Sequence, residues 1–216
     1  MEMKHKVFNL IILDESGSMA SIKNSIINGF NEVVQTVKAV QIQFPEQEHF
    51  ISLVSFNGLG IKTLLEMESV DLLKEIDETK YQPASMTPLY DAMGFSLEKL
   101  RRDVDKLSDY NVLVTILTDG EENSSKEFTA IAIKIFVEEL KAKGWTFTYI
   151  GSEHNVKGFA SSISITNTMF FEKNSKDIKR MFEREKLSRM NYSEKIRNNE
   201  DVQEDFYKDN PVKENK

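Results

Sequence analysis

Residues 7–18 have the sequence VFNLIILDESGS, which joins a strand signal to a polar loop. In the first seven residues every side chain except Asn9 is apolar, and such a run is typical of a parallel strand with both faces covered. Asp14 ends the run and opens a D-x-S-x-S pattern that includes Ser16 and Ser18. The stretch therefore predicts a central strand with oxygen-bearing side chains at its carboxyl end.

Apolar runs and amphipathic stretches alternate along the following sequence, which is the pattern of βαβ units. Apolar residues at steps of three and four predict helices within residues 22–37, 89–107, 131–140 and 178–182. The sequence thus predicts an α/β fold: a doubly wound, mostly parallel sheet with one antiparallel edge strand and helices on both faces. The expected parallel strands are residues 7–13, 50–56, 110–117, 145–150 and 163–171, and the antiparallel edge strand, which follows a turn at 57–60, is 61–65.

Composition excludes several classes of function. The chain has 216 residues, no Cys and three His, so thiolate catalysis, Cys-ligated zinc and a His-rich metal site are excluded or disfavoured. A net charge of −7 argues against a nucleic-acid binder, which needs a basic surface. Asn9 and Asp14 interrupt the first apolar run, so we expect neither a signal peptide nor a membrane span, and we expect a cytoplasmic protein.

Charge density separates the end of the chain from the part before it. We expect one domain over residues 1–188 and a charged tail over residues 189–216. From Asn198 onward only Val202, Phe206, Tyr207 and Val212 are apolar, which we judge too few to bury a face. The tail is therefore predicted to be disordered or loosely docked.

Five oxygen-bearing residues are predicted to gather at the carboxyl edge of the sheet, where ligands bind in open α/β folds. Asp14, Ser16 and Ser18 follow the first strand, Asp119 follows the strand over residues 110–117, and Thr87 opens a helix at the same edge. Two carboxylates and three hydroxyls, without nitrogen or sulfur, suit a hard cation. We expect Mg²⁺, with Mn²⁺ as a possible substitute.

Each of these residues also has a purely structural interpretation. Ser16 and Ser18 suit the cap of the following helix, and Thr87 suits an N-cap with Pro88 at the first helical position. Asp119 and Gly120 form a common turn pair. Their joint placement at one edge favours the metal site.

The pattern of Asp14, Ser16, Ser18, Thr87 and Asp119 resembles the metal-ion-dependent adhesion site of von Willebrand factor type A (vWA) domains. The resemblance covers about residues 5–172 and includes SMTPLYDAMG (residues 85–94), which is similar to the threonine loop of stand-alone bacterial members. Small cytoplasmic proteins associated with tellurite-resistance operons, and hence with stress response, are similar in layout. The departure is that Ser85-Met86 precedes the threonine, where many members have Gly-Gly or Gly-x.

The resemblance implies a Rossmann-like vWA fold, direct metal ligation by Ser16, Ser18 and Thr87, and ligation by Asp14 and Asp119 directly or through water. It further implies a partner protein that supplies Asp or Glu to the metal. We therefore expect a non-enzymatic, Mg²⁺-dependent protein-interaction domain.

Two other functions are compatible with the sequence. A Mg²⁺-dependent phosphohydrolase of the haloacid-dehalogenase type also places an aspartate after its first strand, but it needs a second Asp two residues later, where this chain has Ser16. The remaining alternative is a scaffold whose metal site is vestigial.

Overall fold

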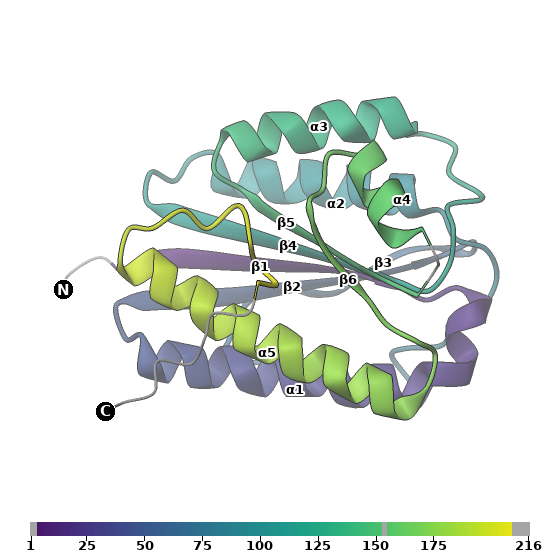
Figure 1. Cartoon of the computed structure of the whole chain (residues 1–216), viewed down its shortest axis with the longest axis horizontal. Coiled ribbons are helices and arrows are strands. Elements are labelled where there is room, and N and C mark those ends of the chain that lie inside the picture. The colour runs from purple at the N-terminus through teal and green to yellow at the C-terminus, as the bar shows by residue number, and fades with distance from the viewer. Residues whose placement is uncertain (1–3, 153–154, 209–216) are drawn as a thin grey trace.

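The sheet forms the centre of the molecule. The computed structural model describes residues 4–152 and 155–208. Its six strands lie in the order β3-β2-β1-β4-β5-β6 (Figure 1). β2 and β3 pair antiparallel, and the other neighbouring pairs are parallel. The strands are β1 (His5–Asp14), β2 (Gln47–Asn57), β3 (Gly60–Ser69), β4 (Tyr110–Thr118), β5 (Thr146–Gly151) and β6 (Asn167–Phe170).

Helices cover both faces of this sheet (Figure 1). α1 (Lys23–Gln43) and α5 (Ser175–Arg197) lie side by side on one face. α2 (Leu89–Val104), α3 (Ala130–Ala142) and α4 (Val156–Ser162) lie on the other. The predicted doubly wound α/β fold with an antiparallel edge strand is confirmed. Within the described residues, no helix has the length and apolar composition needed to cross a bilayer.

Two short elements were not predicted from the sequence. A 3₁₀ helix, η1 (Gly17–Ile22), joins β1 to α1, and α4 precedes β6. The expected strand over residues 163–171 is reduced to β6, because Ile163 and Ile165 are buried in the turn after α4 instead of in the sheet. A helix of two turns is too short to show a helical period in its apolar residues.

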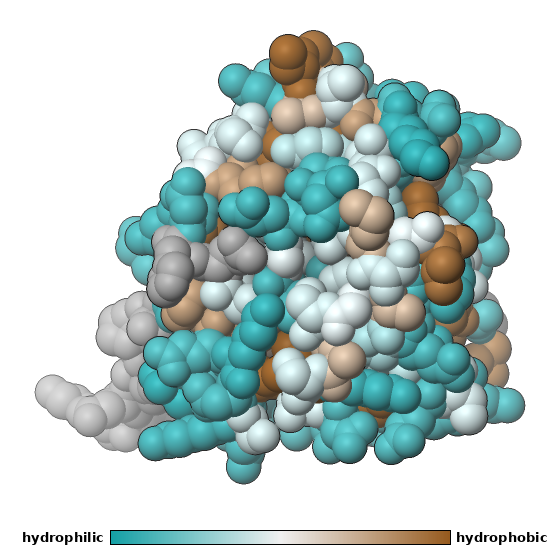
Figure 2. Space-filling model, turned by 90° about the vertical axis from the view of Figure 1, so that its right-hand side faces the viewer, coloured by the Kyte–Doolittle hydropathy of each residue, from teal (hydrophilic) through white to brown (hydrophobic). Residues whose placement is uncertain are grey.

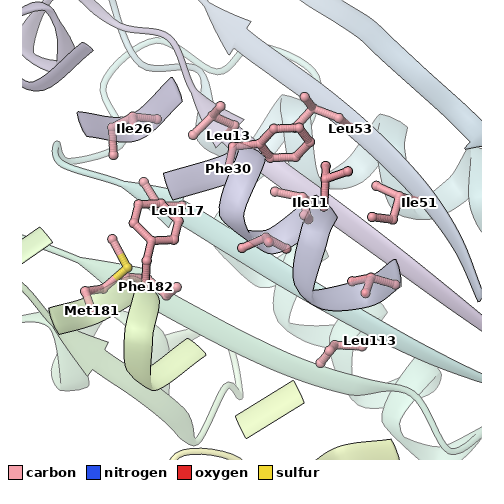
Figure 3. Close-up of a cluster of buried hydrophobic side chains, with 14 of the residues drawn as sticks. Ile11, Leu13, Ile26, Phe30, Ile51, Leu53, Leu113, Leu117, Met181 and Phe182 are labelled. Atoms are coloured by element: carbon pink, nitrogen blue, oxygen red, sulfur yellow. The ribbon is translucent and has the colours of Figure 1, made fainter. Parts of the chain in front are cut away.

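β1 contributes side chains to two separate hydrophobic cores, one on each face of the sheet. Ile11 and Leu13 pack in the core that α1 and α5 close, which Figure 3 shows. Leu10 and Ile12 pack in the core beneath α2 and α3. Successive side chains of a strand point to opposite faces, so a strand covered on both sides requires apolar residues at nearly every position.

Asn9, the polar exception in β1, belongs to a buried network that anchors α5. Its Oδ1 accepts a hydrogen bond of 2.8 Å from Arg189 Nη1 of α5. Arg189 Nη2 also donates to Thr115 Oγ1 of β4 at 2.8 Å and forms an ion pair of 2.8 Å with Glu185. Arg189 and Glu185 are 3% and 1% exposed, so this buried network fixes α5 to the two central strands.

The segment after α5 packs against the molecule through its few apolar side chains. α5 crosses the predicted boundary at residues 188 and 189 without a break and ends at Arg197. Val202, Phe206 and Tyr207 are buried, and the Phe206 amide donates to Asn167 Oδ1 of β6 at 2.9 Å. Three apolar residues are enough here because hydrogen bonds to β5 and β6 fix the segment as well. The division into a domain and a tail stays a prediction, and residues 209–216 lie outside the described residues.

We predict that Arg189→Met lowers the free energy of unfolding by about 3–5 kcal/mol, because it leaves the Glu185 carboxylate buried without its cation. The double variant Arg189→Met, Glu185→Leu removes both charges and should recover most of the loss. Urea unfolding followed by circular dichroism measures both. Equal losses in the single and double variants would show that the ion pair is not what stabilises α5.

Candidate metal centre

The candidate site lies at the edge of the sheet where the parallel strands end. From β1 the chain crosses through α1 on one face to β2, and it returns through α2 on the other face to β4. β1 and β4 are parallel neighbours, so their carboxyl ends form the switch point of the sheet. Asp14 is the last residue of β1, and Asp119 follows β4 directly. Both side chains are buried, with residue exposures of 0% and 1%.

Hydrogen bonds connect the predicted residues around this point. Ser16 Oγ lies 3.1 Å from Ser18 Oγ, and Ser18 Oγ donates to Asp119 Oδ1 at 2.5 Å. Asp14 Oδ1 accepts from the Ser16 amide at 2.7 Å, and Asp14 Oδ2 accepts from Thr118 Oγ1 at 2.6 Å. Residues from β1, η1 and the end of β4 therefore present their oxygens to one small region.

Thr87 approaches the same region from the loop before α2. A Cβ atom added to Gly120 would lie 3.5 Å from Thr87 Oγ1 and 3.6 Å from Ser18 Oγ, so the two hydroxyls flank this glycine. Gly120 directly follows Asp119 in the chain. The structure thus brings all five sequence-predicted residues to one place.

The capping interpretation does not hold for two of the hydroxyls. Ser16 occupies the N-cap position of η1, but its side chain makes no capping hydrogen bond. The N-cap of α2 is Pro88, so the expectation of a Thr87 cap with Pro88 as the first helical residue is wrong by one position. The backbone turn, with the Leu89 amide donating to the Thr87 carbonyl oxygen at 3.0 Å, moves the helix start forward. Both hydroxyls are left for another role.

Two loops are clamped together so that Thr87 and Asp119 stay close. The Thr87 amide donates to Asn123 Oδ1 at 2.9 Å, and the Asn123 amide donates back to the Thr87 carbonyl oxygen at 3.2 Å. Glu122 accepts hydrogen bonds from the Tyr90 amide at 2.8 Å and the Ser125 hydroxyl at 2.6 Å. Sequence reasoning gave Asn123 no role, because nothing in its local sequence shows that it faces Thr87.

A second contact seats the threonine loop on the loop after β1. Glu15 is fully buried, and its carboxylate accepts hydrogen bonds from Ser55 Oγ at 2.9 Å and the Gln82 amide at 2.5 Å. Ser85 has a φ of +66°, a left-handed conformation that favours glycine, and its carbonyl oxygen accepts from the Gly17 amide at 3.0 Å. Ser85 therefore adopts a backbone conformation for which glycine is better suited.

Two carboxylates buried side by side are electrostatically costly. Burial raises the pKa of Asp14, the hydrogen bonds from Thr118 and Ser16 oppose this rise, and the nearby charge of Asp119 adds to it. Asp119 Oδ2 forms an ion pair of 3.0 Å with Lys173 Nζ, whose side chain is 40% exposed. Among the described residues, Asp119 is thus paired with a cationic side chain and Asp14 is not.

The donor set fits a hard divalent cation, because it offers only oxygen atoms and two negative charges. Within residues 4–152 and 155–208 there is no cluster of three or more His, Cys, Asp or Glu side chains that could hold a metal ion. Asp14 and Asp119 supply two negative charges, and Ser16, Ser18 and Thr87 supply neutral oxygens. Oxygen-only donors of this kind suit Mg²⁺ or Mn²⁺ and disfavour softer metals.

Residues 10–184 match the sequence profile of the von Willebrand factor type A domain. The chain belongs to the von Willebrand factor type A domain family. Domains of this family are generally protein-interaction modules without catalytic activity, and they commonly bind a divalent metal at a metal-ion-dependent adhesion site. The finer resemblance to tellurite-resistance-associated members stays a prediction.

Solved structures share the vWA fold at low sequence identity, which shows the fold alone. Proximal thread matrix protein 1 from the mussel byssus is 17% identical, with a TM-score of 0.54 over 84% of this chain and 45% of that one. The D319A mutant of the PilB minor pilin from Streptococcus sanguinis is 13% identical, with a TM-score of 0.57 over 90% and 63%. The SpRpn10 VWA domain is 10% identical, with a TM-score of 0.50 over 82% and 94%.

This vWA chain thus spans about half to two thirds of the length of the first two of these structures. No curated protein sequence is significantly similar to it.

We predict that Asp14→Asn makes the metal-free vWA domain more stable at pH 7. The pKa of Asp14 is raised above its ordinary value of 3.8, so the folded state holds this proton more tightly than the unfolded state. The contribution of Asp14 to stability is therefore lost as the pH rises from 3.8 through the raised pKa. An asparagine has no such dependence. Urea unfolding in chelator between pH 4 and pH 7 measures the difference.

Asp103→Asn serves as the matched control, because Asp103 is exposed on α2 and its charge is solvated. It should leave stability nearly unchanged at each pH. An Asp14→Asn protein that is less stable than wild type at pH 7 would contradict the account of a carboxylate buried at a cost.

Proposed function

We propose that this vWA domain binds a divalent cation and through it captures an acidic side chain of a protein partner. Mg²⁺ is the expected cation, and Mn²⁺ is a possible substitute. The observation that carries the proposal is the continuous series of side-chain oxygens from Ser16 through Ser18 to Asp119, beside the buried carboxylate of Asp14.

The roles of the five residues follow from their chemistry and from the family resemblance. Ser16, Ser18 and Thr87 would hold the cation directly, and Asp14 and Asp119 would do so directly or through water. A bound cation would balance the two buried negative charges and keep enough positive charge to attract an outside anion. A carboxylate of Asp or Glu from a partner protein is that anion.

The surface around the site suits a protein partner. Figure 2 views the molecule from the side to which the parallel strands run, and this face is mostly hydrophilic with small hydrophobic patches. Leu59, in the turn between β2 and β3, is 78% exposed, and Met86, next to Thr87, is 52% exposed. The two loops touch, since a Cβ on Gly58 would lie 3.1 Å from Met86 Cβ. Apolar side chains beside the cation would add contact area to the charge interaction.

Ser16 favours a non-enzymatic function over phosphate-ester hydrolysis, because it stands where a hydrolase would need an acid. A haloacid-dehalogenase-type mechanism needs an acid two residues after the nucleophilic aspartate to move the proton. Ser16 Oγ has Ser18 Oγ as its hydrogen-bond neighbour, and neither hydroxyl can act as that acid at neutral pH. Turnover of a generic phosphate ester that depends on Mg²⁺ and on Asp14 would overturn this choice.

Cation binding is tested by thermal unfolding with and without Mg²⁺ or Mn²⁺. A ligand selective for the folded state stabilises it, by about 2.7 kcal/mol at a hundredfold excess over Kd. We expect wild type and the control Ser21→Ala, which changes an exposed serine of η1, to be stabilised. Ser16→Ala should fold normally, because the Ser16 side chain makes no capping hydrogen bond to η1, but it should lose most of the shift. An unchanged melting temperature in wild type would favour the vestigial scaffold.

Partner capture is tested by affinity purification from a lysate of the source organism with Mg²⁺ or with chelator. A true partner should be retained by wild type and Ser21→Ala in Mg²⁺ and lost with chelator or with Ser16→Ala. Replacing one Asp or Glu of that partner should abolish binding. Capture that persists in chelator and with Ser16→Ala would rule out a metal-mediated contact.

A further inference from the structure

Lys173 carries a positive charge into the candidate metal centre from a distant part of the chain. It lies in the loop between β6 and α5, more than fifty residues after Asp119. Its Nζ is 3.0 Å from Asp119 Oδ2, and the Asp119 side chain is fully buried while the lysine side chain is 40% exposed. One end of this ion pair is therefore fixed in the sheet, and the other is on a flexible, half-exposed side chain.

The loop backbone holds Lys173 in place for this contact. Asn174 is the N-cap of α5, and its side chain accepts a hydrogen bond of 2.9 Å from the Asp177 amide. On the other side, the Glu172 amide donates to Asp177 Oδ2 at 2.7 Å. Because Lys173 lies between these two anchored residues, its position is set by the start of α5.

The two oxygens of Asp119 have different partners. Oδ1 accepts the hydrogen bond from Ser18, whereas Oδ2 contacts the ammonium of Lys173 and no hydrogen-bond donor in good geometry among the described residues. Among the described residues, Asp119 forms its ion pair with Lys173, and Asp14 forms no ion pair. Lys173 is therefore the cationic side chain that balances charge at the site. Another lysine near the site, Lys62, is paired with Glu15.

We propose that Lys173 is an internal counter-ion that competes with the divalent cation for Asp119. In the metal-free protein its ammonium group balances part of the buried negative charge. When a cation binds, Lys173 has to release Asp119 Oδ2, so the ion pair sets the metal affinity of the site below what its oxygen donors would give alone. This inference rests on the proposed function, because it assumes that the site takes a cation.

The competition has two measurable consequences. Removing the ammonium should strengthen Mg²⁺ binding by about 1.5-fold to fivefold, the range expected for an ion pair with one half-exposed partner. It should also lower the melting temperature in chelator, because Asp14 and Asp119 then face each other without a balancing charge. A residue that merely positions Asp119 for the metal would instead lower the Mg²⁺ affinity when it is changed.

The test is isothermal titration of the full chain with MgCl₂, together with melting temperatures in chelator. Lys173→Gln removes the charge, and Lys173→Arg keeps it. Lys176→Gln is the matched control, since Lys176 is exposed in the first turn of α5 and the net charge changes equally. We expect tighter Mg²⁺ binding and a lower metal-free melting temperature for Lys173→Gln alone.

The possible outcomes distinguish failure of the counter-ion role from failure of the metal site itself. Binding by Lys173→Gln but not by wild type would support it, because the lysine would then block the site completely. Equal or weaker binding by Lys173→Gln, in a wild type that binds Mg²⁺, would overturn the counter-ion and leave the metal site intact. Absence of binding in wild type and in every variant would overturn both.

Discussion

Two negative charges, Asp14 and Asp119, are held out of water at the ends of neighbouring parallel strands, and the surrounding structure is organised around that constraint. Isolated buried carboxylates are unfavourable unless hydrogen bonds or a cation stabilise them. Asp14 receives its hydrogen bonds from Ser16 and Thr118, within the loop and strand that carry the site. Such costs are typical of functional sites, where a protein gives up stability to keep groups ready for a ligand.

Three other acidic residues near this edge, Glu15, Glu122 and Asp91, have structural roles, which separates them from the two ligand candidates. Glu15 and Glu122 accept backbone and hydroxyl hydrogen bonds that join loops far apart in the sequence. Asp91 does the same for the backbone amides of residues 126–128. The loops are therefore fixed by carboxylates whose oxygens are already used, so that Asp119 and the nearby hydroxyls need not stabilise the fold.

The sequence contained enough information to predict the fold class and the convergence of the five candidate residues. Long apolar runs identify the buried strands, and in a parallel sheet their carboxyl ends share an edge, so Asp14 and Asp119 are expected at the same edge. That β1 and β4 are direct neighbours, which brings the two carboxylates together, is a finding of the structure. Tertiary partners were not predictable in the same way. Nothing near Lys173 or Asn123 in the chain indicates what each contacts. In the sequence Asn9 is only an interruption of an apolar run, because its partner Arg189 lies 180 residues away in the chain. Short segments such as α4 and residues 202–207 lack a periodic pattern and depend on contacts made by the folded chain.

The central claim is that oxygens from the end of β1, the start of η1, the threonine loop and the end of β4 hold one divalent cation. Anomalous X-ray scattering from crystals of the protein soaked in Mn²⁺ locates such an ion directly. The account predicts a single strong peak bounded by the hydroxyl oxygens of Ser16 and Ser18 and by the side chains of Thr87 and Asp119, with metal–oxygen distances of about 2.0–2.2 Å. A peak elsewhere, or none here at saturating Mn²⁺, would contradict it.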